Sequence, residues 1–204
     1  SPGVSLNQSK NKKQLIRYKN KIITDIDLFY LFHKDFKSIF VTGTNGKSTT
    51  CKIINHILKK NKIKTLLGGN IGTPILSLNP KKNTYLIIEA SSFQLAYSKF
   101  IKPNYALLLN ITNDHIDWHG SKKNYIDSKF KIFKNQKQNH YSLLNEDLKF
   151  QYKKRKLLGK LIIPKFFQYK KFKSKIENKY LNLKINDENM SFVYELSKLL
   201  KITQ

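Results

Sequence analysis

The chain has 204 residues, of which 40% are hydrophobic and 25% are charged. This balance supports one good-sized packed domain and argues against wholesale disorder. No apolar run reaches about 18 residues, and residues 1–30 hold no continuous apolar stretch, which excludes an ordinary transmembrane helix and a secretory signal peptide. The one cysteine, Cys51, cannot form an intramolecular disulfide, as is typical of a cytoplasmic protein.

The formal net charge of +26 would ordinarily indicate a nucleic-acid or anionic-surface partner. Only Arg17 and Arg155 among the 39 basic residues are arginines, however, and 20 asparagines accompany the lysines. Surfaces that read bases or clamp phosphates rely on the bidentate fork of arginine. We therefore expect no specific nucleic-acid partner and interpret the lysine content first as genomic bias, with weak polyanion binding as the alternative.

In chain order, residues 1–37 are polar and lysine-rich and predict an entry segment with some local structure. From Ser38 onward, apolar runs at 39–41, 65–67, 85–88, 105–109 and 141–144 predict buried strands, and helical spacing predicts helices over 48–61, 122–136 and 189–200. Apolar strands with helix-length connections predict an α/β fold with a mostly parallel sheet and helices on both faces. Residues 149–184 predict short, irregular β-rich structure, with its clearest strand at 161–163.

The strongest local signal is the segment Gly43-Thr44-Asn45-Gly46-Lys47-Ser48-Thr49, between a predicted strand and a predicted helix. Glycines let backbone N–H groups converge on a phosphate, and the helix N-terminus adds positive potential. In such a P-loop-type turn Lys47 would reach the β- and γ-phosphates and the Ser48 hydroxyl would hold Mg²⁺. The alternative interpretation is a glycine turn that carries an ordinary surface lysine.

Acidic and histidine side chains follow two later strands. Glu89 ends one strand at the edge where a parallel sheet binds ligands, which suits a metal beside the phosphates, although a surface acid or a helix cap has the same pattern. Asp114 and His115 could likewise bind metal or cap a helix. With Asp117 and His119 they have zinc-like spacing, but neither cysteines nor a helical histidine pair accompany them, so we do not predict zinc.

Five segments of the chain resemble, in order and spacing, the Mur ligases of peptidoglycan synthesis. They are residues 43–49, Gly69-Asn70-Ile71-Gly72, residues 89–95, residues 109–115 and Tyr125–Lys129. The resemblance covers residues 1–147 and is greatest to the D-glutamate-adding member. It implies that residues 1–37 follow a missing N-terminal UDP-binding domain, with Ser1-Pro2-Gly3 as the join. Residues 38–204 would form the ATP-binding central domain, and a C-terminal domain would be absent.

The resemblance implies an ATP-dependent amide ligation with ATP and Mg²⁺ as cofactors and UDP-N-acetylmuramoyl-L-alanine and D-glutamate as partners. The substrate carboxylate would attack the γ-phosphate, and the D-glutamate amine would displace the resulting acyl phosphate. The isolated chain is expected to be a cytoplasmic monomer that binds Mg·ATP weakly and does not ligate alone. The resemblance implies that Gly43, Thr44, Asn45, Gly46, Lys47, Ser48 and Thr49 bind the triphosphate. It implies one metal held by Ser48 and Glu89, and a second held by His115 and a carbamylated Lys129. Contacts with the UDP-substrate are implied for Asn70, Ser91, Gln94 and His115.

The family's late motif Gly-x-His-Asn-x-x-Asn is reduced here to Ile185-Asn186-Asp187-Glu188-Asn189, without its glycine and histidine. Adenine contacts are expected from Asn186 and Asn189. Two alternatives stay open. One is a sibling Mur ligase or a folylpolyglutamate synthase-like ligase, and the other is a basic polyanion-binding module on a nucleotide-binding fold.

Overall fold

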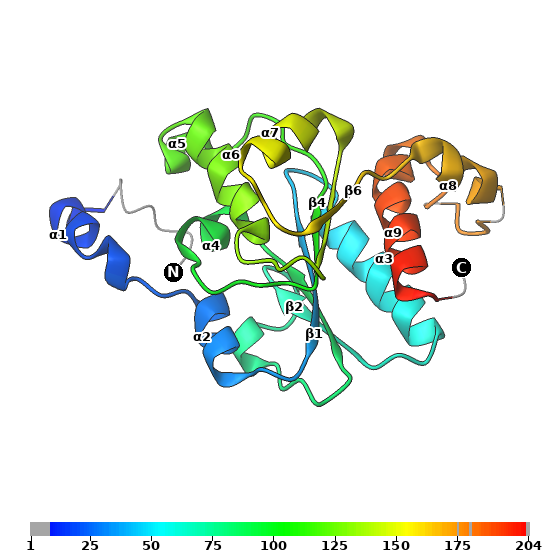
Figure 1. The fold of residues 1–204 in the computed structure, drawn as a ribbon, viewed down its shortest axis with the longest axis horizontal. Coiled ribbons are helices and arrows are strands. Elements are labelled where there is room, and N and C mark those ends of the chain that lie inside the picture. Colours follow the sequence, from blue (N-terminus) through cyan, green and yellow to red (C-terminus); the bar gives the residue numbers. More distant parts are fainter. Residues whose placement is uncertain (1–8, 175, 180, 203–204) are drawn as a thin grey trace.

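The computed structural model describes residues 9–174, 176–179 and 181–202, so the predicted join at Ser1-Pro2-Gly3 lies outside the described residues. Its centre is a sheet in the order β2-β3-β1-β4-β5-β6, in which every pair of neighbours is parallel (Figure 1). The predicted parallel α/β sheet is confirmed. The strands are β1 (Lys37–Thr42), β2 (Thr65–Gly69), β3 (Tyr85–Glu89), β4 (Tyr105–Leu108), β5 (Tyr141–Leu144) and β6 (Lys160–Ile162).

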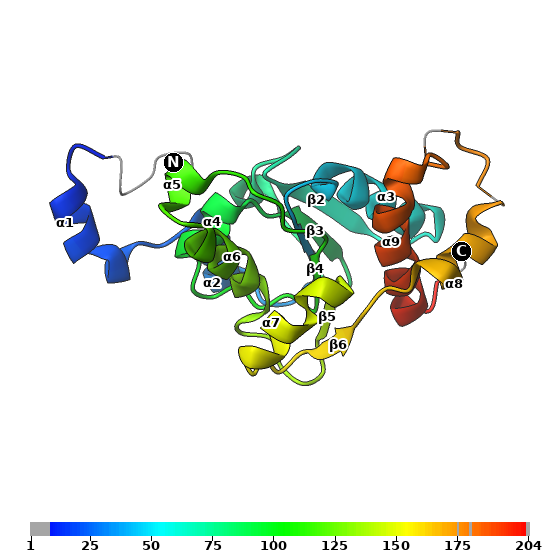
Figure 2. The same ribbon diagram turned by 90° about the horizontal axis from the view of Figure 1, so that it is seen from above.

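Helices cover both faces of the sheet, as Figure 2 shows. One face is covered by α3 (Lys47–Lys60) and α9 (Asp187–Leu200), with α8 (Phe166–Lys173) packed on α9. The other is covered by α2 (Asp25–Phe32), α4 (Ser92–Tyr97), α6 (Lys122–Phe130) and α7 (Lys149–Lys154). The smaller elements are α1 (Lys12–Arg17), α5 (Ile116–His119) and the 3₁₀ turns η1 (Lys19–Lys21), η2 (Ile75–Ser77), η3 (Lys131–Phe133), η4 (Glu146–Leu148) and η5 (Lys184–Asn186).

The sequences of the strands are continuous apolar runs because both faces of the sheet are buried. In β1, Phe40 belongs to the apolar cluster under α2 and α6, whereas Ile39 and Val41 belong to the cluster under α3 and α9. Successive side chains of a strand point to opposite faces, so a sheet covered twice needs apolar residues at every position.

The second half of the predicted entry segment is part of this packed body. Thr24 and Asp27 form a reciprocal capping box at the start of α2, and Ile26 and Phe29 are buried in the core. The fully buried Asp27 carboxylate also accepts the backbone N–H groups of Lys99 and Phe100. Helix α2 is thereby tied to the segment that follows α4.

The β-rich structure predicted for residues 149–184 is wrong, because among the described residues of this segment β6 is the one strand and α7 and α8 are helices. In α7 the alternation of Phe150 and Tyr152 between polar residues resembles a strand, yet Tyr152 is buried and Phe150 is 75% exposed. Lysine and glutamine are good helix formers, and this local preference prevails where the strand pattern is short. Helix α9 also begins two residues before the predicted start at residue 189.

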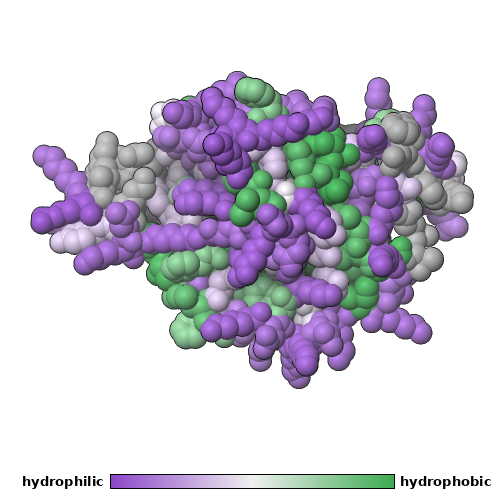
Figure 3. Space-filling view, viewed as in Figure 1, coloured by the Kyte–Doolittle hydropathy of each residue, from purple (hydrophilic) through white to green (hydrophobic). Residues whose placement is uncertain are grey.

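Hydrophilic side chains are spread over the face shown in Figure 3 and do not gather over one element. This distribution agrees with a compositional origin of the lysines. In the part of the chain that the structure describes, no helix combines the length and the apolar character needed to cross a bilayer.

Candidate active site

The loop between β1 and α3 has the form that the sequence predicts. Gly46 is the N-cap of α3 with φ +81°, a left-handed conformation that favours glycine, and it makes no side-chain cap. The first N–H groups of a helix have no partner inside the helix, and they stay available to an anion when no side chain caps them. A Cβ at Gly46 would overlap the side chain of Asn189, so the start of α9 packs directly on the loop.

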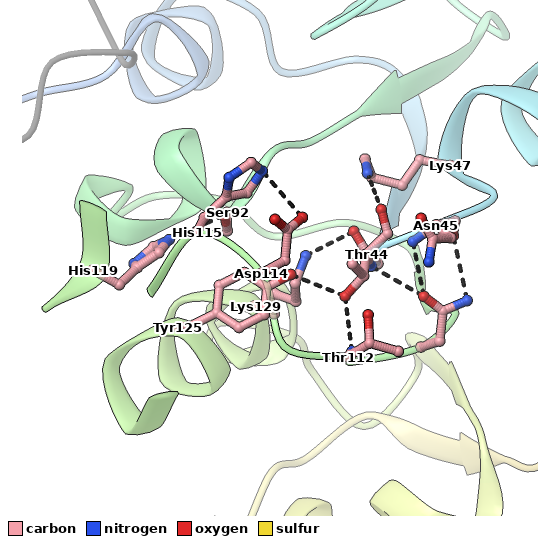
Figure 4. A network of polar contacts seen from close by, with 12 residues as sticks. Thr44, Asn45, Lys47, Ser92, Thr112, Asp114, His115, His119, Tyr125 and Lys129 are labelled. Carbon is pink, nitrogen blue, oxygen red and sulfur yellow. Dashed lines mark hydrogen bonds and ion pairs between the residues drawn. The ribbon is translucent and has the colours of Figure 1, made fainter. Parts of the chain in front are cut away.

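Two lysines contact neighbouring carbonyls of this loop. Lys47 Nζ donates to Thr44 O at 2.7 Å, and Lys129 Nζ, from α6, donates to Gly43 O at 2.7 Å (Figure 4). The Thr44 hydroxyl lies 2.9 Å from the Tyr125 hydroxyl and accepts the N–H of Thr112 at 3.0 Å. The loop is therefore held from two sides, and two lysine amines lie against its backbone.

A carboxylate lies beside the first turn of α3. Ser48 Oγ donates to Glu89 Oε2 at 2.7 Å, and Asn70 Nδ2 donates to Glu89 Oε1 at 2.9 Å. The parallel register explains this meeting, because Glu89 pairs with Val41 on one side and Gly69 on the other. Glu89 is 1% exposed and both donors are neutral. A hydroxyl and a carboxylate oxygen at a buried, negatively charged position suit Mg²⁺.

Lys129 is the most unusual titratable group of the site. It is 2% exposed, and its Nζ lies 4.7 Å from the centre of the Tyr125 ring. Burial lowers its pKa from the ordinary 10.5 to about 7; the charge of Lys47 acts in the same direction and Asp114 opposes it. A substantial fraction of this amine is therefore neutral near neutral pH, which is the form that reacts with CO₂.

The side chain of His115 approaches the same place. His115 has φ +51° at the N-cap of α5, and its Nε2 lies 3.2 Å from Asp114 Oδ2. A cavity of about 110 Å³ is lined both by residues of the loop and by His115 and Lys129. Its lining includes the predicted residues Gly43, Thr44, Lys47, Asn70, Ser91, His115 and Lys129.

Gln94 is placed differently from the rest of the predicted site. Its Oε1 accepts the N–H of Ser91, and its own N–H donates to the Ser91 hydroxyl, which makes a capping box at the start of α4. Its Nε2 reaches Asp25 Oδ2 at 3.4 Å. Gln94 does not line this cavity and positions Ser91, while its expected contact with the substrate stays a prediction.

The two asparagines of the late motif do reach the loop. Asn186 and Asn189 are largely buried and line a cavity of about 460 Å³ on the outer side of the loop. The remaining lining residues are Asn45, Gly46, Thr49, Asn110, Thr112 and Glu188. This arrangement leaves room for a group beyond the phosphates.

Several lining residues had no predicted role, notably Ser92, Phe93 and Tyr125. His119, just behind the cavity wall, lies with Nε2 3.0 Å from Ser92 Oγ, and burial lowers its pKa to about 4, so the ring is neutral at neutral pH. The presence of Tyr125 beside Lys129 could have been predicted from the sequence, because side chains four residues apart on a helix share a face.

Asp114, His115, Asp117 and His119 have zinc-like spacing in the sequence. Among residues 9–174, 176–179 and 181–202, no group of three or more histidine, cysteine, aspartate or glutamate side chains is placed to hold a metal ion. The oxygen pair of Ser48 and Glu89 differs from such a cluster, because a hydroxyl and a carboxylate are oxygen donors of the type that suits Mg²⁺.

Comparisons with known proteins agree with this geometry. The model of the Mur ligase middle domain matches residues 41–202. UDP-N-acetylmuramoylalanine–D-glutamate ligase of Rickettsia bellii is 34% identical over 98% of this chain and 49% of its own length. The enzyme of the same name from Wolbachia pipientis is 47% identical over 65% of the chain and 26% of its own length.

Solved structures share the fold. MurF ligase of Thermotoga maritima, in complex with ADP, has a TM-score of 0.53 at 23% identity and covers 76% of this chain and 36% of its own. FolC of E. coli, in complex with DHPP and ADP, has a TM-score of 0.52 at 14% identity and covers 80% of this chain and 52% of its own. Since the family model matches most of the sequence, this chain belongs to the Mur ligase family and contains its middle domain.

Proposed function

We propose that this chain is the ATP-binding part of a ligase that joins D-glutamate to UDP-N-acetylmuramoyl-L-alanine through an acyl phosphate. The chain spans about half the length of its Rickettsia bellii relative, so the activity of a whole ligase is part of the proposal. The observation that carries it is the phosphate loop at the N-terminus of α3 with the Ser48–Glu89 pair beside it. The relatives' shared name favours D-glutamate over the amino acids of sibling ligases.

The triphosphate would lie against residues 43–49, where the first N–H groups of α3 converge. Lys47 would leave Thr44 O and neutralise charge that develops on the transferring phosphoryl group. Ser48 and Glu89 would hold Mg²⁺, which supplies charge neutralisation between phosphate oxygens when bound. Asn186 and Asn189 would contact the adenine.

The acceptor carboxylate would enter the cavity lined by Asn70, Ser91 and His115. Carbamylation would convert the Lys129 amine into an anionic oxygen ligand, and together with His115 it would form a second metal site. The lowered pKa of Lys129 supports this assignment, because a protonated amine cannot take up CO₂. Gln94 would act indirectly, by holding Ser91.

Calorimetry of Mg·ATP binding at moderate salt tests the nucleotide site. Lys47→Ala should weaken binding by about 10- to 100-fold, because a charge-assisted hydrogen bond to phosphate contributes about 1.5–3 kcal/mol. The matched control is Lys52→Ala, which removes the same charge from an exposed position of α3 and should change little.

A general polyanion-binding surface would give a different result. Lys47→Ala and Lys52→Ala would then lose equal affinity for ATP, and this affinity would fall steeply as salt rises and would not depend on Mg²⁺. The acceptor site is tested separately by titrating UDP-N-acetylmuramoyl-L-alanine while following the backbone amide signals of Asn70 and Ser91. Movement of signals elsewhere but not at these two residues would contradict the proposed acceptor site.

A further inference from the structure

Asn110 follows β4 directly and lies beside the phosphate loop. The pairing of β4 with β1 continues past the strand ends, since Leu109 N donates to Thr42 O at 2.9 Å and Thr44 N donates to Asn110 O at 3.0 Å. This register carries the Asn110 side chain to the outer side of the loop, where it lines the cavity shared with Asn189.

The Asn110 carboxamide makes three further contacts with the loop. Its Oδ1 accepts the N–H of Thr44 at 3.1 Å and the N–H of Asn45 at 2.9 Å. Its Nδ2 donates to Asn45 O at 3.3 Å. A single side chain thus engages both the N–H and the carbonyl of Asn45, so it fixes the direction in which that part of the backbone faces.

We propose that Asn110 is the positioning residue of the phosphate loop: its carboxamide turns the Asn45 backbone toward β4, so that the N–H groups from Gly46 onward face the phosphates. The inference rests on the proposed nucleotide-binding function and adds a residue that acts through the backbone of the loop. An asparagine suits this position because it offers an acceptor and a donor together without charge.

The two loop N–H groups differ in a way that provides an internal control. Thr44 N–H has both the main-chain and the side-chain oxygen of Asn110 as acceptors, whereas Asn45 N–H donates to the side-chain oxygen of Asn110. Removing the carboxamide should therefore affect the Asn45 amide much more than the Thr44 amide.

The experiment compares Asn110→Ala and Asn110→Asp with Asn104→Ala. Asn104 is the matched control, because it precedes β4 and its Oδ1 accepts the N–H of Ser38 at 2.9 Å, at the opposite end of β1 from the loop. For each variant, amide hydrogen exchange at Thr44 and Asn45 is measured by NMR, and Mg·ATP affinity is measured by calorimetry.

Asn110→Ala should speed exchange at Asn45 more than at Thr44 and weaken Mg·ATP binding about tenfold, the effect of one or two lost hydrogen bonds. Asn110→Asp keeps the acceptor, so the Asn45 amide should stay protected while binding still weakens, because the new charge repels phosphate. Asn104→Ala should alter neither quantity.

Unchanged exchange at Asn45 in Asn110→Ala, or an affinity within about twofold of the native chain, would overturn the inference. If Asn110→Ala does not fold, loss of Asn45 protection in Asn110→Asp overturns it instead. A native chain that binds no Mg·ATP would refute the proposed function, whereas the exchange measurement would still decide whether Asn110 positions the loop.

Discussion

The candidate nucleotide site has two sides that are built differently. On the phosphate side, residues 43–45 form hydrogen bonds with side chains from the first turn of α3, the segment after β4 and α6. On the base side, Asn186 and Asn189 come from the start of α9, where Asn189 packs on Gly46 and Asn145 Nδ2 donates to both Glu188 Oε1 and Leu109 O. Hydrogen bonds thus hold the loop directly on the phosphate side, whereas the base side meets the loop by packing at Gly46.

This difference parallels the clarity of the sequence signal. A loop whose backbone must converge on phosphate tolerates few residue types, because each glycine and polar side chain has a defined partner. On the base side the late motif keeps two asparagines without its glycine and histidine.

The largest expected effect concerns Lys129, on the phosphate side. Its pKa is about 7 in the folded chain and about 10.5 when unfolded, so between these values the unfolded chain binds one more proton. Its contribution makes the free energy of unfolding rise with pH by about 1.4 kcal/mol per unit. Denaturant unfolding from pH 7 to 9 in CO₂-free buffer should show this rise, and Lys129→Met should lose it.

The control for that comparison is Lys123→Met, which removes an exposed lysine from the same helix and should keep the native slope. Identical slopes in the native chain and Lys129→Met would show that the amine is not buried as described.

The next effect tests the packing that joins the two sides. Gly46→Ala should destabilise the chain by about 2 kcal/mol, because a Cβ at φ +81° is strained and overlaps the side chain of Asn189. In the double variant Gly46→Ala/Asn189→Ala the overlap disappears, and about 1 kcal/mol of backbone strain should remain. Additive effects in this double-mutant cycle, measured by urea denaturation, would mean that the two residues do not touch.

The smallest effect separates the base from the phosphates. Asn189→Ala should weaken Mg·ATP binding about fivefold, the contribution of about one hydrogen bond, and leave binding of magnesium tripolyphosphate unchanged. Calorimetry with both ligands measures the ratio, and Asn139→Ala, at an exposed asparagine before β5, serves as the control. Equal weakening for both ligands would place Asn189 on the phosphate side.

Much of the fold could be predicted, because strands buried on both faces leave continuous apolar runs and Gly43–Thr49 leaves a specific motif. The structure of residues 149–184 could not be predicted in this way. Helix α7 is short and carries apolar residues at alternate positions, which is also the pattern of a strand. Gln94 is instructive in another way. Ser91-x-x-Gln94 has the spacing of a capping box, and the structure forms that box at the start of α4.

What no local pattern could predict is contact between distant segments. Asn189 packs closely on Gly46, although the two residues are 143 positions apart in the sequence. The contacts of Asn110 depend on the register between β1 and β4. Such contacts arise only once the sheet has assembled.

The hydrogen bond between Lys47 Nζ and Thr44 O has a consequence for ligand choice. Any anion that recruits this ammonium must first displace an internal carbonyl, so weakly charged ligands gain little by exchanging one oxygen partner for another. A ligand that presents several phosphate oxygens at once gains more from the exchange. The loop should therefore select against nucleoside monophosphates and inorganic phosphate even before any contact with the base is made.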